Sequence, residues 1–239
     1  MLQNNVFLDL VKQFSSFLLI FCCIGCEKER VEAPLSWSSI PLFDGMTQFF
    51  EVNERVHIPN EAPKSHRFYL KMVFFMDSLR FNGQVFIVEY YSASSLTSPW
   101  KFDSISLVKQ TPASFVVYEK NQWNTKLQFP LYTDKSWPIF TTRTGLNSTS
   151  AQVSTFLIEK KWQEKVVPLA TEITYQADSS LIHLEKHIEW YAPSIGLLQK
   201  YQVNLKYCED SPDCIGLGII TNGYERTISR IRLGNTLND

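Results

Sequence analysis

The chain has 239 residues, of which 44% are hydrophobic and 20% are charged, so it can bury a substantial core and is not intrinsically disordered. Its 23 basic residues nearly balance 24 acidic residues, which gives a net charge of -1. This balance argues against a nucleic-acid partner, which needs a basic patch, and against a polybasic membrane-binding arm.

The first apolar segment predicts export. Residues 14–24 read FSSFLLIFCCI, a run of about 11 residues, whereas a helix that crosses a bilayer needs about 20. Lys12 precedes the run, as expected for the apolar centre of a secretory signal peptide. An ordinary cleaved signal peptide and an uncleaved anchor helix are both open at this point.

A cysteine follows this apolar run. Residues 23–26 read CIGC, which places a small residue before Cys26, and the chain turns polar at Glu27. The pattern resembles the lipobox of bacterial lipoproteins, although Cys23 stands where that family usually has leucine. In the family the cysteine thiol receives a diacylglycerol, the peptide is cut before it and the new N-terminus is acylated. The resemblance implies a signal peptide over residues 1–25 and a lipidated Cys26.

The residues after Cys26 are polar and predict a tether over residues 26–39, which leaves a single domain over residues 40–239. The domain retains two cysteines, Cys208 and Cys214. In an oxidising periplasm they would form a disulfide, worth about 2.4 kcal/mol in the chain-entropy model. Free thiols or a metal site are the alternatives, but two thiols fall short of a zinc pattern.

Most of the domain has the two-residue period of β-strands. We therefore predict a mainly β fold of about ten strands with little helix: a large antiparallel curved sheet, arranged as a half-barrel, barrel or sandwich. Residues 159–166 are the exception, as an extended strand or a brief helix. Asn82-Gly83 predicts a hairpin turn, and Asn222-Gly223 is expected to introduce the last strand. The expected strands cover residues 49–56, 66–76, 84–93, 102–109, 114–119, 151–160, 169–176, 181–191, 196–207 and 224–233.

One strand carries a row of potential ligands. His183, Glu185, His187 and Glu189 alternate, so they share one face of the strand. Two imidazoles and two carboxylates could hold a divalent metal, but neighbours in such a row stand about 6.6 Å apart, which is loose for shared ligation. We expect this face to be solvated, and we expect neither a metal nor another cofactor.

Three motifs carry a second resemblance. Residues 190–198 read WYAPSIGLL, residues 41–45 read PLFDG and residues 129–131 read FPL. These are similar to a YAPGIGLVK hairpin, an opening PL..G segment and a central FPL stretch of uncharacterised outer-membrane lipoproteins of the Bacteroidetes type. The resemblance implies a curved antiparallel sheet, and it implies neither a catalytic residue set nor a known substrate.

We therefore expect a non-enzymatic lipoprotein of the outer membrane, held by Cys26 at the periplasmic or the external face. Its β domain would bind a partner or support the envelope, and the candidate partners are an envelope protein, a lipid or a glycan. One alternative is a half-barrel carrier of a lipid or other apolar ligand. The other is a glycan hydrolase that uses Glu185 or Glu189 as one of two opposed acids.

Overall fold

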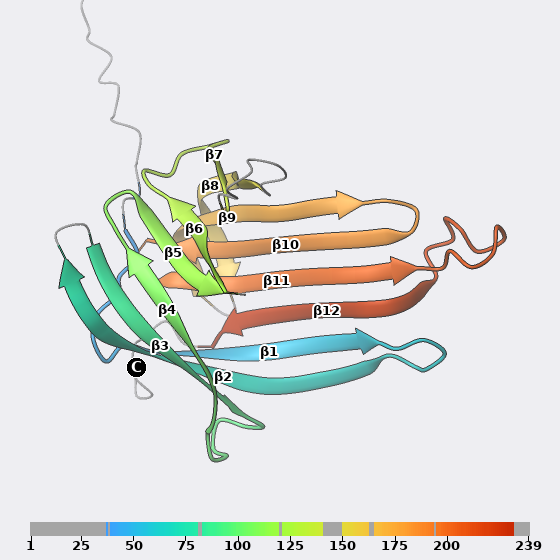
Figure 1. Ribbon diagram of the computed structural model, residues 1–239, viewed down its shortest axis with the longest axis horizontal. Helices are drawn as coiled ribbons and strands as arrows, with labels where there is room; N and C mark the ends of the chain where they lie inside the picture. Colours follow the sequence, from blue (N-terminus) through green and yellow to red (C-terminus); the bar gives the residue numbers. More distant parts are fainter. Residues whose placement is uncertain are drawn as a thin grey trace, which may run out of the picture. The chain divides into compact units, whose positions relative to one another are not determined.

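The computed structural model describes residue 37 and residues 39–80, 83–119, 121–140, 150–162, 165–193 and 195–231. The predicted signal peptide, Cys26 and most of the predicted tether lie outside the described residues. All named strands belong to one antiparallel sheet with the order β6-β5-β4-β3-β2-β1-β12-β11-β10-β9-β8-β7 (Figure 1). The strands are β1 (Thr47–His57), β2 (Lys64–Arg80), β3 (Gly83–Ala93), β4 (Lys101–Gln110), β5 (Ser114–Glu119), β6 (Gln122–Gln128), β7 (Ser136–Pro138), β8 (Ser150–Trp162), β9 (Lys165–Ser179), β10 (His183–Ala192), β11 (Gly196–Tyr207) and β12 (Ile220–Arg230).

The predicted fold class is confirmed, with two strands, β6 and β7, added to the expected set. The residues that the structure describes contain no helix, and hence none long and apolar enough to cross a membrane. Residues 159–162 end β8 and residues 165–166 begin β9, and Trp162 pairs with Lys165. The brief-helix alternative for this segment is therefore wrong.

The prediction that Asn222-Gly223 introduces the last strand is also wrong, because both residues lie inside β12. Gly223 is required there by a close backbone approach. Its φ is +128°, and a Cβ atom on it would lie 2.1 Å from the carbonyl oxygen of Asn204 on β11. A glycine in a strand can mark such an approach as well as a turn.

The sheet curls until its two ends meet, which makes a nearly closed barrel. The backbone N–H of Thr125 on β6 donates to the carbonyl of Ile139, just after β7, at 2.6 Å. The indole of Trp137 on β7 donates to the Thr125 carbonyl at 3.1 Å, and the Tyr175 hydroxyl on β9 donates to the Lys126 carbonyl at 2.8 Å. One sheet closed on itself excludes the sandwich, and it brings β6 close to β9 and β10.

Apolar side chains from both halves of the sheet fill the barrel. Trp37 is part of this core, with 4% of its surface exposed and a bridge to Leu131. It therefore belongs to the packed body rather than to the predicted tether. A smaller cluster groups Trp162, Val167, Ala170, Ala192 and Leu198. The main core comprises Trp37, Ile40, Met46, Phe74, Phe86, Val88, Val108, Phe115, Val117, Leu127, Phe129, Leu131, Trp137, Ala151, Val153, Ile173, Tyr175 and Tyr191.

Candidate functional site

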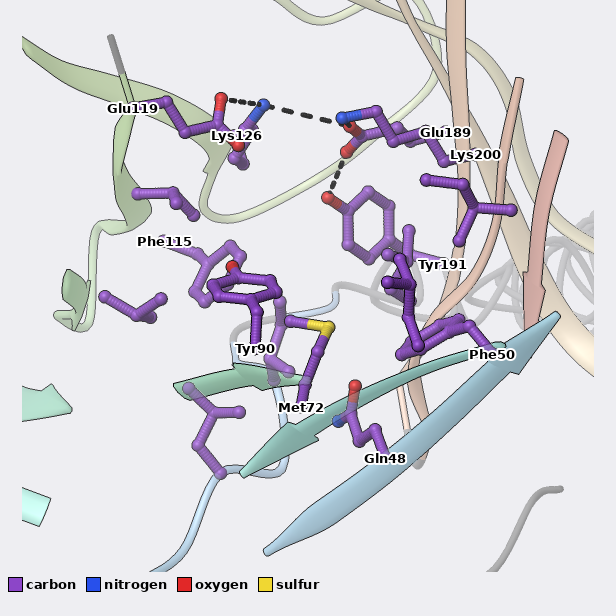
Figure 2. Close-up of a pocket in the computed structure, with 17 residues that line it drawn as sticks. Gln48, Phe50, Met72, Tyr90, Phe115, Glu119, Lys126, Glu189, Tyr191 and Lys200 are labelled. Atoms are coloured by element: carbon purple, nitrogen blue, oxygen red, sulfur yellow. Dashed lines mark hydrogen bonds and ion pairs between the residues drawn. The ribbon is translucent and has the colours of Figure 1, made fainter. Parts of the chain in front are cut away.

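An apolar cavity of about 140 Å³ lies among these core side chains (Figure 2). In the figure, the charged side chains gather at one end of the cavity, while Met72, Phe50 and Phe115 lie away from them. Strands from both halves of the sheet contribute to the walls. The uncharged lining residues are Ile40, Leu42, Gln48, Phe50, Leu70, Met72, Tyr90, Val108, Phe115, Val117, Tyr191, Leu197 and Ile228.

A second, polar pocket of about 360 Å³ adjoins the first. Three charged residues, Glu119, Lys126 and Lys200, line both spaces. These side chains therefore stand at the boundary between an apolar space and a polar one. The remaining residues of the polar pocket are Gln122, Asn124, Ile139, Phe140, Tyr175, Gln176, His187 and Gln202.

Lys126 contacts carboxylates on two different strands. Its ammonium lies 2.9 Å from a carboxylate oxygen of Glu119 on β5 and 3.8 Å from Glu189 on β10. Only 7% of the Lys126 side chain and 3% of the Glu189 side chain are exposed, whereas the Glu119 side chain is 38% exposed. The Lys126–Glu189 pair is thus removed from water, where the loss of either partner is costly.

Glu189 is the centre of the charged cluster. One oxygen accepts a hydrogen bond from the His187 imidazole at 2.8 Å and lies 3.7 Å from the Lys200 ammonium. The other oxygen accepts a hydrogen bond from the Tyr191 hydroxyl. The described neighbours therefore engage both oxygens of this buried carboxylate.

Strand geometry explains how these groups meet. His187, Glu189 and Tyr191 are two residues apart along β10 and point to the same face. Trp190 and Tyr191 on β10 pair with Gln199 and Leu197 on β11. Leu198 is therefore an extra residue on β11, at a β-bulge. The bulge shifts the alternation, so that Leu197 and Lys200 both face the cavity.

Burial and the neighbouring charges shift the pKa values of the groups in this cluster. Burial alone would raise the pKa of Glu189, but Lys126, His187 and Lys200 hold it well below its ordinary value. Burial would lower the pKa of Lys126, but Glu189 and Glu119 outweigh that effect and raise it. For Lys200, burial dominates and lowers the pKa, with partial compensation from Glu189. Near pH 7 the cluster therefore holds a protonated Lys126 and an ionised Glu189.

The row of His183, Glu185, His187 and Glu189 does not form one solvated face. Glu189 is 2% exposed and points into the barrel with His187, so the expected solvated face is wrong for both. His183 lies at the other end of β10, where its imidazole contacts Asp178 at 3.0 Å and Ser180 at 2.7 Å. Within the described part of the chain, no three His, Cys, Asp or Glu side chains gather closely enough to hold a metal ion. Glu185 does not join the cluster around Glu189.

His187 should make the stability of the protein sensitive to pH below neutrality. Burial lowers its pKa from 6.5, against the opposing effect of Glu189, so the unfolded chain binds a proton before the folded one as the pH falls. We expect wild type to lose stability from this group below pH 6.5, by at most about 1.4 kcal/mol per pH unit. His187→Gln keeps a donor for Glu189 but does not titrate, so its free energy of unfolding should fall less between pH 7.5 and 5.5. Parallel curves in urea titrations of the two proteins would contradict this role.

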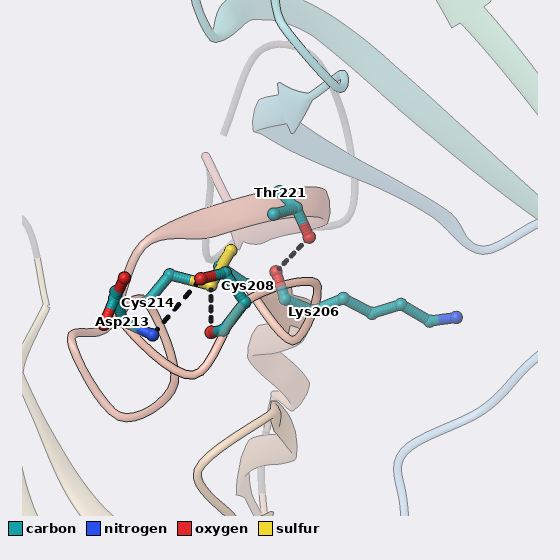
Figure 3. The surroundings of a disulfide bond; sticks show 6 residues. Lys206, Cys208, Asp213, Cys214 and Thr221 are labelled. Atoms are coloured by element: carbon teal, nitrogen blue, oxygen red, sulfur yellow. Dashed lines mark hydrogen bonds between the residues drawn. A yellow bond between two sulfur atoms is a disulfide. The ribbon is translucent and has the colours of Figure 1, made fainter.

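The disulfide is not part of this cluster and lies in the loop between β11 and β12 (Figure 3). Cys208 and Cys214 are bonded, with their Cα atoms 5.7 Å apart, as the sequence predicts. The backbone N–H of Cys208 donates to Ile219 at 2.8 Å, and the Thr221 hydroxyl donates to the Lys206 carbonyl at 3.2 Å. These bonds tie the disulfide loop to the ends of both strands.

Lys126, Lys200 and Tyr191 are site residues that were not predicted from the sequence. A signal for Tyr191 was present, because an aromatic residue in register with His187 and Glu189 is unexpected on a solvated face. Lys126 lies on a strand that the sequence did not predict, and the bulge at Leu198 hides the orientation of Lys200. Neither lysine could be placed from periodicity alone.

Comparisons with known proteins give no family. No protein-family model and no curated protein sequence matches the chain. One similar solved structure is a protein from Bacteroides fragilis described as exported, with a YmcC-like fold: TM-score 0.38, 10% identity, 82% of this chain and 98% of that chain covered. Another is a protein from Parabacteroides distasonis described as a lipoprotein: TM-score 0.35, 10% identity, 81% and 97% covered. Likenesses at this level assign neither a family nor a function to this chain.

Proposed function

We propose that this protein is a lipid-anchored envelope protein whose barrel binds a small, partly apolar ligand and does not transform it. One observation carries the proposal: an apolar cavity inside the barrel adjoins a polar pocket, with buried charged groups between them. Ligand sites are typically concave and mostly apolar, with a few placed polar groups that fix orientation. This arrangement favours an amphiphilic ligand.

The volume of the cavity limits the apolar part of the ligand. It measures about 140 Å³, close to the engineered cavity of about 150 Å³ that holds benzene. A short alkyl chain or a single ring suits this space, whereas a whole membrane lipid exceeds it. Of the functions considered from the sequence, the carrier of an apolar ligand is supported best, with a smaller ligand than a lipid.

The state of Glu189 supports binding over catalysis. A glycosidase needs one carboxyl group with a raised pKa as its general acid. Three neighbours hold the pKa of Glu189 well below its ordinary value, and both of its oxygens are engaged. This carboxylate is suited to fixing the positions of Lys126, His187 and Lys200 rather than to proton transfer.

The proposed location rests on the sequence around Cys26 and on the disulfide. The lipobox resemblance gives a thiol for acylation, and two or more acyl chains hold a protein stably on a bilayer. The Cys208–Cys214 disulfide suits an oxidising compartment outside the cytoplasm. We therefore place the barrel at the outer membrane, attached through Cys26.

Filling the cavity should abolish binding of a neutral probe. Val117 on β5 lines the cavity, so the ring of Val117→Phe would occupy the space that a ligand needs. We expect the variant to bind hexan-1-ol at least about tenfold more weakly than wild type, as followed by NMR chemical shifts. Val116→Phe is the matched control, because adjacent residues on a strand point to opposite faces. Equal affinities for the two variants, or no saturable binding to wild type, would overturn the proposed function.

A further inference from the structure

We propose that Lys200 anchors the acidic end of the ligand, so that the barrel selects a short-chain carboxylate over a neutral molecule of the same shape. This inference rests on the proposed function and names the ligand class of the same site. It starts from the position of Lys200, which lines both the apolar cavity and the polar pocket. A group bound to its ammonium could therefore extend an apolar tail into the cavity.

The ammonium of Lys200 has unused hydrogen-bonding capacity. It can donate three hydrogen bonds. Among the described residues its one charged contact is Glu189, at 3.7 Å, which is beyond hydrogen-bonding distance, and it makes no hydrogen bond to them. Only 19% of the side chain is exposed, so bulk water has limited access. A ligand oxygen would supply the acceptor that this group lacks.

The two carboxylates near Lys200 already have other partners. Glu119 pairs with Lys126 at 2.9 Å, while Glu189 accepts hydrogen bonds from His187 and Tyr191. Both carboxylates, on Glu119 and Glu189, lie within 4 Å of the Lys126 ammonium, whereas of these two only Glu189 lies that close to Lys200. Lys200 is therefore the less completely paired of the two cations, and an anionic ligand would supply its ammonium with a close acceptor.

The shape of the site sets the length of the ligand. The apolar cavity accepts a chain of a few carbons, and Lys200 stands where this cavity meets the polar pocket. A carboxylate at the end of such a chain would reach Lys200 without entering the apolar part of the cavity. Hexanoate fits this description, and hexan-1-ol and hexanamide are neutral molecules of similar shape.

The test compares these three probes on wild type and on variants at Lys200. We expect wild type to bind hexanoate at least about tenfold more tightly than hexan-1-ol, because a charge-assisted hydrogen bond contributes more than a neutral one. Lys200→Met should remove this preference, so that the variant binds hexanoate and hexan-1-ol with affinities within about twofold of each other. Lys200→Arg should keep most of the preference for hexanoate. Lys206→Met is the matched control on the same strand, where the side chain is exposed and lines neither space.

The outcomes separate this inference from the proposed function. Equal binding of hexanoate and its neutral analogues to wild type would overturn the role of Lys200 while hexan-1-ol still bound in the cavity. An unchanged hexanoate preference in Lys200→Met would overturn it as well. Failure of wild type to bind hexan-1-ol would instead overturn the proposed function.

Discussion

Lys126→Met is expected to lower the free energy of unfolding by about 3–5 kcal/mol, because it removes one of the two lysines that face the buried Glu189 carboxylate and leaves Glu119 without its partner. Methionine keeps most of the length of the lysine side chain, so the effect should come mainly from charge rather than from a cavity. The loss should appear in urea denaturation near pH 7, where Glu189 is ionised. Removing a single buried partner costs more than the pair contributes, since the remaining charge stays out of water.

Two further variants test whether the loss of the buried charge pair causes the drop in stability. Lys126→Met combined with Glu189→Gln removes both charges and should recover part of the loss, with a coupling energy of about 0.5–3 kcal/mol. Lys64→Met breaks an exposed ion pair with Glu61, 2.6 Å long, and should cost less than about 1 kcal/mol. If Lys126→Met were no more costly than Lys64→Met, the charged cluster would not stabilise the barrel.

Cys26→Ala is expected to release nearly all of the protein from the membrane fraction and to abolish its labelling with palmitate. The thiol is the atom that would carry the diacylglycerol, and without acyl chains the anchoring energy of about 0.8 kcal/mol per buried CH₂ is lost. Cys22→Ala is the control, since Cys22 lies in the predicted signal peptide and should not affect labelling. Palmitate incorporation into Cys26→Ala at the wild-type level would contradict lipidation at this residue.

Most of the sheet could be predicted because its strands alternate in the ordinary way. β6 could not, because its pattern is inverted: Trp123 is exposed, whereas Asn124 and Lys126 are buried. Inward-facing charges are one way in which proteins protect a strand at the edge of a sheet from pairing with other chains. β7 has only three residues, too few to show a period.

The site was harder to predict than the fold because its polar groups satisfy one another inside the barrel. A sequence pattern places polar residues at the surface by default, and this rule fails where a buried carboxylate has buried cations as partners. The contacts between Lys126 and Glu189 join β6 to β10, and they depend on the closure of the sheet. The orientation of Lys200 depends on a bulge that the sequence around Leu198 does not signal.

The most direct test of the account is a crystal structure of the barrel domain with 6-bromohexanoate, in which anomalous scattering locates the bromine. We expect the bromine inside the cavity, near Phe50, Val108 and Val117, with the carboxylate about 2.7–2.9 Å from the Lys200 ammonium. A bromine found only on the outer surface, with the cavity empty at a saturating concentration, would contradict the claim that the barrel interior is a ligand-binding site.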